Sequence, residues 1–262
     1  MTKQLSAVKG PVAIKNVAEF MAMTTRLIER DAHLPGISVC SGFSGFGKTW
    51  ASIFAQNKTN AVRVEVGDSW TCRSVLVGVL RELSEPVKNR QSLSEMVDVA
   101  VGKLSDDPNR PLIVDEADKL VDKNMIEIVR ELHERSGVPV ILIGEERLPT
   151  KLLNFERVHN RVLHWMQAQP CDLEDARALA DAYAPGVAIK DDLLEKLRAA
   201  SDGRARRIVV NVHRVEDFAR NVGKKTIDLD MWGRQQFHTG EPPQVRAADP
   251  YPKRSSSIRQ VA

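Results

Sequence analysis

The stretch Gly42-Phe43-Ser44-Gly45-Phe46-Gly47-Lys48-Thr49 matches the pattern G-x-x-x-x-G-K-[ST]. Glycines let successive backbone amides turn toward one point, and these amides, with the start of a following helix, cradle phosphate oxygens. In such a loop the lysine reaches the β- and γ-phosphates of a nucleotide, and the final hydroxyl is a ligand of Mg²⁺. A glycine-rich turn can also arise by chance. Here the apolar run Ile37–Ser41 directly precedes the loop and predicts the buried strand that a phosphate-binding loop (P-loop) requires.

ATP and Mg²⁺ are therefore the predicted cofactors. The expected nucleotide contacts are Gly42, Phe43, Ser44, Gly45, Phe46, Gly47, Lys48, Thr49 and Trp50. Lys48 is also a candidate catalytic residue, because its charge stabilises a transferred phosphoryl group, and Thr49 is a candidate metal ligand.

A second motif, LIVDE at 112–116, is a hydrophobic strand that ends in two adjacent carboxylates. Asp115 is expected to hold the Mg²⁺ with its water shell, and Glu116 to polarise the attacking water as general base. Such a pair can also be an acidic helix cap, but its position downstream of a P-loop favours the catalytic interpretation. Glu116 thus predicts an ATPase and not a passive nucleotide-binding module. Asp118 is interpreted as a helix cap and not as a ligand.

Strand and helix signals alternate along the first part of the chain. Strands are predicted at Ile37–Ser41, Ala61–Val66, Leu112–Asp115, Val138–Ile143 and Leu163–Met166. Helices are predicted from Asn16, at Cys72–Leu83, from Ser92, at Met125–Arg135 and at Leu152–Val162. Asn16 with Glu19 matches a capping box at the start of the first helix. Five strands separated by helices predict an α/β fold with a doubly wound parallel five-stranded sheet.

The pattern changes after Pro170, where only helices are expected. They are predicted at Asp172–Tyr183, Asp191–Ala200 and Arg204–Val222. The last thirty residues are rich in proline and serine and predict a disordered basic tail. The expected organisation is a flexible N-terminal arm at 1–15, a P-loop domain at 16–168, a small all-helical domain at 169–232 and the tail at 233–262.

Composition and charge restrict the kind of partner. The 262 residues are 42% hydrophobic and 28% charged, which is ordinary for a globular protein, and the formal net charge is +3. Residues 233–262 hold five basic and two acidic side chains, so the rest of the chain is neutral overall. Any DNA site in the body of the protein must therefore be a local patch.

Three cysteines, Cys40, Cys72 and Cys171, are far apart and form no C-x-x-C pair, which disfavours disulfides and zinc and suits a reducing compartment. The N-terminal residues contain no apolar signal segment, and no apolar run approaches the length of a membrane span. We expect a cytoplasmic protein without a membrane partner, in the bacterial host cytoplasm if a phage encodes it.

The two motifs and the trailing helices resemble the AAA+ ATPases, in which a helical lid follows the P-loop domain. The resemblance implies a polar sensor residue after the fourth strand, where Glu145 stands and the family more often has Asn, Thr or Ser. It implies an arginine finger that completes a neighbouring subunit's site, with Arg157 and Arg161 as candidates one helical turn apart. It also implies a lid arginine at the γ-phosphate, with Arg206 as candidate. Surface arginines and a plain basic helix start are the alternatives.

Within that family the chain resembles the DNA-transposition ATPases, typified by the B transposition protein of phage Mu. The similarity lies in segments 144–148 and 155–161, the helix before the P-loop and the small lid. It implies a homo-oligomer, as a ring or helical filament, that binds double-stranded DNA with little sequence preference, delivers it to a transposase, and leaves on hydrolysis. The Mu protein has an N-terminal helix-turn-helix domain that this sequence leaves no room for, so DNA contact is expected from the body and tail.

Three regions are candidates for that contact. The first is the segment with Trp70, Thr71 and Arg73, where hydroxyl and guanidinium groups suit DNA phosphates. The second is the basic run at 201–225, with Arg204 and Arg207. The third is the tail. The alternatives are a core position for Trp70, a solvated lid face and a plain linker.

Two other functions remain open at this point. One is a helicase loader or replication-initiator ATPase of the same fold, which a replicative helicase partner would identify. The other is a nucleotide-gated scaffold or signalling ATPase with no role on DNA.

Overall fold

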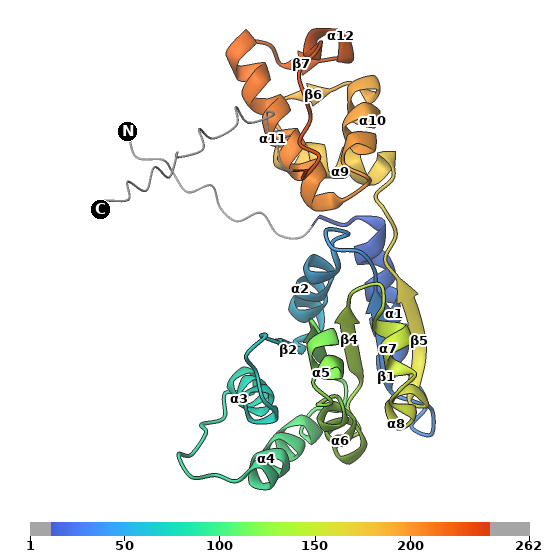
Figure 1. The fold of residues 1–262 in the computed structure, drawn as a ribbon, viewed down its shortest axis with the longest axis vertical. Coiled ribbons are helices and arrows are strands. Elements are labelled where there is room, and N and C mark those ends of the chain that lie inside the picture. Colours follow the sequence, from blue (N-terminus) through green and yellow to red (C-terminus); the bar gives the residue numbers. More distant parts are fainter. Residues whose placement is uncertain (1–11, 242–262) are drawn as a thin grey trace, which may run out of the picture.

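The computed structural model describes residues 12–241, which form an α/β domain and a smaller helical unit stacked at one end of it (Figure 1). The strands are β1 (Ile37–Ser41), β2 (Val62–Glu65), β3 (Leu112–Asp115), β4 (Val140–Gly144) and β5 (Val162–Gln167). They form one sheet in the order β2-β3-β4-β1-β5, and every pair is parallel. The predicted doubly wound five-stranded sheet is confirmed.

The central strands are apolar because both faces of the sheet are covered. Every residue of β1, β3 and β4 is buried. Side chains such as Ile113 and Ile141 pack into a core shared with α1 (Lys15–Ile28) and α2 (Lys48–Thr59). Their neighbours along the strands pack into a second core on the opposite face.

That second core is covered by six helices. They are α3 (Cys72–Glu82), α4 (Leu93–Ser105), α5 (Asp118–Asp122), α6 (Glu127–Ser136), α7 (Leu148–Leu152) and α8 (Glu156–His159). The Ser92–Glu95 capping box that starts α4 is present. The single helix predicted at Leu152–Val162 is wrong: α7 ends at Leu152 and α8 begins at Glu156. Phe155, with φ −122° and ψ 69°, precedes α8, and its side chain packs against the second core.

The start of α1 also differs from the prediction. The helix begins at Lys15, with Ile14 as its N-cap, and Asn16 is buried inside it, so the predicted Asn16–Glu19 capping box is wrong. The Asn16 side-chain amide donates to the carbonyls of Phe46 (2.8 Å) and Gln169 (2.7 Å), and its oxygen accepts from Gln169 N–H (2.9 Å). Asn16 therefore joins α1 to the P-loop and to the segment that leads into the helical unit.

The helical unit is not made of helices alone. It contains α9 (Leu173–Tyr183), α10 (Asp191–Ala200), α11 (Ala205–Val222) and α12 (Leu229–Trp232), and also two short parallel strands, β6 (Ala188–Ile189) and β7 (Thr226–Ile227). This pair of strands corrects the prediction of helices only. Strands of two residues are too short to produce a periodic pattern in the sequence. The apolar core of the unit is continuous with the α1 side of the sheet.

The segment after Trp232 is packed and not part of a disordered tail, as far as residue 241. The Phe237 ring stacks on Trp232 at 5.4 Å, and His238 and buried Asn211 exchange hydrogen bonds of 2.7 and 3.0 Å. The rest of the predicted tail, 242–262 with Arg246, Lys253 and Arg254, lies outside the described residues, as does most of the predicted arm. Across residues 12–241 no helix combines the length and apolarity that a membrane crossing needs.

Candidate nucleotide site and candidate DNA groove

The P-loop runs from the end of β1 to the start of α2. Its conformation depends on glycine, because Gly45 (φ +91°) and Gly47 (φ +87°) are in the left-handed region. Gly47 is the N-cap residue of α2 and has no side chain to occupy the free amides of the first turn. The loop therefore directs unpaired N–H groups at the space beside it, as anion binding requires.

Lys48 lies over its own loop. Its ammonium group donates to the carbonyls of Gly42 (2.5 Å) and Phe43 (3.0 Å). Burial lowers the pKa of Lys48, and the nearby carboxylates of Asp115 and Glu116 act against that shift. The Lys48 ammonium group thus donates to loop carbonyls, and the phosphate oxygens of a nucleotide can take their place.

The two carboxylates after β3 have different environments. Asp115 is buried, and its Oδ1 accepts from the Glu116 N–H at 3.0 Å. Glu116 has a left-handed backbone (φ +58°), and its half-exposed carboxylate is 3.7 Å from the Lys119 ammonium. Both residues line the same cavity as Lys48 and Thr49. The turn at Glu116 thus separates the Asp115 carboxylate, which is buried and held in place, from the Glu116 carboxylate, which is accessible.

These oxygen donors fit Mg²⁺, which prefers one or two protein oxygens completed by nucleotide phosphates and water. Thr49 and Asp115 line one cavity beside the phosphate loop. Among the described residues there is no group of three or more His, Cys, Asp or Glu side chains that could hold a metal ion.

Asp118 has a different role from the predicted helix cap, which is wrong: α5 has Ala117 as its N-cap and no side-chain cap. The Asp118 Oδ2 accepts from the Glu145 N–H at 2.6 Å, and a Cβ on Gly144 would lie only 2.0 Å from that oxygen. Glycine at 144 is thus needed for Asp118 to fix the turn after β4. That turn places Glu145 on the cavity lining.

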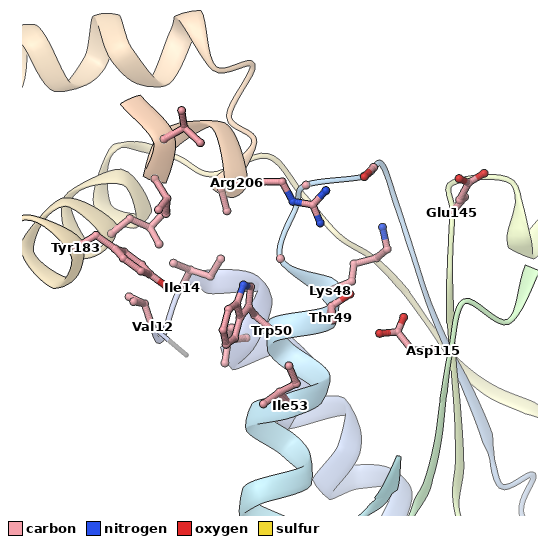
Figure 2. Close-up of a pocket in the computed structure, with 18 of the residues that line it drawn as sticks. Val12, Ile14, Lys48, Thr49, Trp50, Ile53, Asp115, Glu145, Tyr183 and Arg206 are labelled. Carbon is pink, nitrogen blue, oxygen red and sulfur yellow. The ribbon is translucent and has the colours of Figure 1, made fainter. Parts of the chain in front are cut away.

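The cavity has a polar and an apolar end and a volume of about 520 Å³. Figure 2 shows Lys48, Thr49, Asp115 and the Arg206 guanidinium around the polar end. Arg206 comes from the first turn of α11, and its backbone N–H donates to the Gly45 carbonyl at 3.3 Å. The helical unit therefore meets the P-loop directly and closes one side of the cavity.

The apolar end was not predicted, apart from Trp50. It is lined by Val12, Ile14, Val17, Ile53, Leu179, Tyr183, Ala205, Val209 and Val210, together with Trp50 (Figure 2). These residues come from the segment before α1, from α1 itself, from α2, from α9 and from α11. No local pattern marks them, because their only shared property is the cavity that they line. Their apolar surfaces suit a flat aromatic base.

The predicted finger arginines are not part of this cavity. Arg157 is exposed on α8, and its side chain makes no hydrogen bond or ion pair with residues 12–241. Arg161 follows the end of α8, donates to the Arg157 carbonyl (2.7 Å) and pairs with Glu134 of α6. The two arginines, predicted to lie one turn apart on a helix, do not share one, because α8 ends at His159.

Three of the predicted DNA residues lie together. Trp70, Thr71 and Arg73 line a surface groove of about 330 Å³ along α3, with Arg81 at its other end. Thr71 is the N-cap of α3, and exposed Arg73 donates to the Gln91 carbonyl at 2.6 Å. Trp70 is half-buried, with its ring against Gly67 and Gly78.

The other two lie elsewhere and are engaged. The Arg204 guanidinium donates to the Ser44 carbonyl at 2.9 Å and lies 6.0 Å from the Phe43 ring. Arg207 pairs with Asp202 at 2.5 Å. The basic run of the helical unit is thus partly directed at the P-loop, and Arg204 is a contact between the two units of the structure.

Residues 30–152 match the family model described as an AAA domain, and the chain has the AAA+ P-loop ATPase fold. Three similar structures are an ORC2 and an ORC1 protein, both from Aeropyrum pernix, and domain III of the replication initiation protein DnaA from Thermotoga maritima. The ORC2 protein, in its ADPNP–ADP complexes, is 15% identical with a TM-score of 0.68, covering 86% of this chain and 68% of that one. The ORC1 protein, in complex with DNA, is 15% identical with a TM-score of 0.63, covering 87% and 66%.

The DnaA domain is 18% identical with a TM-score of 0.54, and the match covers 84% of this chain and 90% of that one. This chain therefore spans about two thirds of the two archaeal chains and most of the bacterial domain. At these identities the likeness concerns the fold alone. No curated protein sequence matches this one significantly.

Proposed function

We propose that this protein is an ATPase that assembles on duplex DNA in its ATP-bound form, delivers that DNA to a transposase, and is released on hydrolysis. The observation that carries the ATPase part is the meeting of Lys48, Glu116 and Arg206, from three separate segments, on one cavity with an apolar end. A cation pair at the phosphates, a carboxylate and a slot for a base are the parts that nucleotide hydrolysis needs.

Each polar residue has a distinct task in the proposed reaction. Lys48 exchanges its loop carbonyls for phosphate oxygens, and Arg206 reaches the phosphates from the lid. Glu116 takes a proton from the attacking water, for which its half-exposed carboxylate is free apart from the 3.7 Å pair with Lys119. Thr49 and Asp115 would hold Mg²⁺, which supplies charge neutralisation at the phosphates when it is bound.

The active form in this proposal is an oligomer. The Arg157 side chain is exposed, has no hydrogen bond or ion pair with residues 12–241, and is absent from the lining of its own chain's cavity. A guanidinium supplied from a neighbouring subunit stabilises charge on the transferred phosphate. Arg157 is a better candidate than Arg161, which Glu134 already neutralises.

The groove on α3 is the proposed DNA contact. Hydroxyl and guanidinium groups at Thr71, Arg73 and Arg81 suit backbone phosphates, and the Trp70 ring presents an apolar surface for a sugar. Because the body of the chain is neutral overall, one copy attracts DNA weakly. A ring or filament repeats the groove along the duplex, so that assembly makes the binding strong.

The transposase is the most specific part of the proposal and rests on the sequence resemblance at 144–148 and 155–161. The second candidate is a replication initiator or helicase loader, which the likeness to the ORC2, ORC1 and DnaA structures favours. A nucleotide-gated scaffold without DNA is the third.

The decisive test is duplex DNA binding with ATP, with ADP and without nucleotide, observed by negative-stain microscopy. We expect rings or filaments on DNA with ATP alone, and an affinity that falls steeply with salt. Binding that is equal in all three states, or independent of salt, would contradict the proposal. Absence of DNA binding in every state would favour the scaffold.

The partner is tested separately by capture with DNA-bound, ATP-loaded protein. Retention of a transposase, with target joining stimulated in the presence of ATP, is the expected result. Retention of a replicative helicase in its place would favour the second candidate.

A further inference from the structure

Arg63 contacts the candidate metal site from the edge of the sheet. It lies on β2, next to β3, and its Nη2 donates to the Asp115 Oδ2 at 2.8 Å. The two side chains are 13% and 4% exposed, so this ion pair is almost dry. The register pairs Glu65 with Asp115, which places Arg63 diagonally across from Asp115 on the same face of the sheet.

The same guanidinium is linked to the P-loop helix. Its Nε donates to the Ser52 Oγ at 2.8 Å, and Ser52, which is fully buried, donates to the Thr49 carbonyl at 2.7 Å. Arg63 thus connects the two candidate metal ligands, Asp115 directly and Thr49 through Ser52. A further contact of 3.2 Å to exposed Glu65 completes its partners.

The local charge makes this contact significant. Five carboxylates lie at this edge of the sheet: Glu65, Asp115, Glu116, Asp118 and Glu145. Asp115 is the most buried of those that line the cavity, and a buried carboxylate requires a cation nearby when no metal is bound. Arg63 is the cation that pairs directly with Asp115, at one carboxylate oxygen, while the Glu116 N–H occupies the other. Lys48, the other cation near Asp115, donates to the loop carbonyls instead.

We propose that Arg63 is a positioning residue that serves as the counter-ion of Asp115 before metal arrives and then weakens the hold of that carboxylate on Mg²⁺. The inference rests on the proposed ATPase function and adds a control of its metal dependence. Since the guanidinium remains beside Asp115, the protein's own ligands bind Mg²⁺ weakly. Firm binding then depends on the phosphates of the nucleotide.

The test is the apparent affinity for ADP measured by fluorescence titration across a range of Mg²⁺ concentrations, with no turnover required. For Arg63→Met, which removes the charge and keeps an apolar stem, we expect the half-saturating Mg²⁺ concentration to fall at least threefold. We also expect a lower unfolding temperature without metal, because Asp115 is left buried and unpaired. Mg²⁺ with ADP should then raise the unfolding temperature of the variant more than that of the wild type.

Two further variants separate charge from packing. Arg63→Lys keeps the charge and should keep the wild-type Mg²⁺ dependence. Arg130→Met removes a comparably buried arginine that pairs with Glu127 and Glu134 on α6, and should lower stability without changing the Mg²⁺ dependence.

The outcomes are distinguishable. An unchanged or raised half-saturating Mg²⁺ concentration in Arg63→Met would overturn the inference and leave Arg63 as a structural residue. The same would follow if Arg63→Lys, which retains the cation, behaved like Arg63→Met. Failure of the wild-type protein to bind ADP with Mg²⁺ at all would overturn the proposed ATPase together with the inference.

Discussion

The carboxyl edge of the sheet and the region around α8 carry charge in opposite ways. At the edge, buried and half-buried charges have partners within the chain. Lys48 donates to a carbonyl of its own loop, Asp115 pairs with Arg63, and Asp118 accepts from the backbone amide of Glu145. Around α8, the exposed Arg157 side chain has no hydrogen bond or ion pair with residues 12–241, and Trp165, whose ring is 5.5 Å from that of His159, is 45% exposed. The charges of the first region are paired within one chain, and the second region exposes an unpaired guanidinium that the proposed function assigns to a neighbouring subunit.

Lys48→Ala should have the largest effect, since it removes the main cation of the first region. We expect loss of ATP binding and, with it, of ATP-dependent DNA binding, although the fold is retained. Equilibrium nucleotide binding and a DNA mobility shift measure the two losses. Wild-type DNA binding by this variant would show that the groove on α3 acts independently of the cavity.

Arg157→Ala tests the proposal that the exposed arginine on α8 acts on a neighbouring subunit. Hydrolysis should fall by about 10³-fold, while ATP affinity of the single chain stays near wild type, because a finger acts on the transition state of an adjacent site. Steady-state phosphate release measures the fall. The matched variant Arg161→Ala should lose stability through its pair with Glu134 and affect turnover less.

Mixing variants decides whether the arginine acts between subunits. A mixture of the Arg157→Ala protein with the Glu116→Gln protein should recover part of the activity. The first variant keeps its cavity intact, and the second keeps the arginine that would act on a neighbouring cavity. No recovery at any ratio would assign Arg157 to its own chain.

Glu116→Gln alone should reduce hydrolysis by about 10²-fold or more and leave nucleotide and DNA binding intact, since the amide cannot accept the proton. Single-turnover measurements with bound ATP, compared with the binding constants, separate the two properties. Normal turnover would assign the general base to another group, with Glu145 the next carboxylate on the cavity lining.

Asn16→Ala should have the smallest effect on chemistry and a clear one on stability. Three hydrogen bonds from a buried amide are lost, and we expect the free energy of unfolding to fall by about 1–3 kcal/mol. Chemical denaturation measures it. Glu19 is the other residue of the capping box that the sequence predicted, and its side chain is exposed, so Glu19→Ala should change stability little.

The sheet and the phosphate end of the cavity could be predicted because their signals are local. A P-loop, a strand ending in two carboxylates and alternating apolar runs each occupy a few consecutive residues. Arg63 could not be predicted in the same way: its partners Ser52 and Asp115 meet it only after three elements have packed together. The apolar end of the cavity depends on Tyr183 and Ile14, which the chain separates widely and the fold brings together.

Boundaries failed where burial outweighed local preference. Asn16 has the side chain of a helix cap, yet its amide has partners inside the protein. Phe155 interrupts a helical pattern to reach the core, and residues 233–241 have a tail-like composition but a packed conformation. In each case one contact with a distant element decides the structure.

The packed segment at 233–241 determines where the protein can be shortened. A chain ended at Trp232, the natural limit from composition, would lose the Phe237 ring and leave the buried Asn211 amide without its His238 partner. Gly240 lies against Arg207, in a groove that also includes Ser44 and Gly45 of the P-loop. The described chain therefore ends beside a groove that shares Ser44, Gly45 and Arg206 with the cavity. It also begins there, since Val12 and Ile14 line the same cavity, so that truncation at either end of the described chain removes residues that contact or adjoin it.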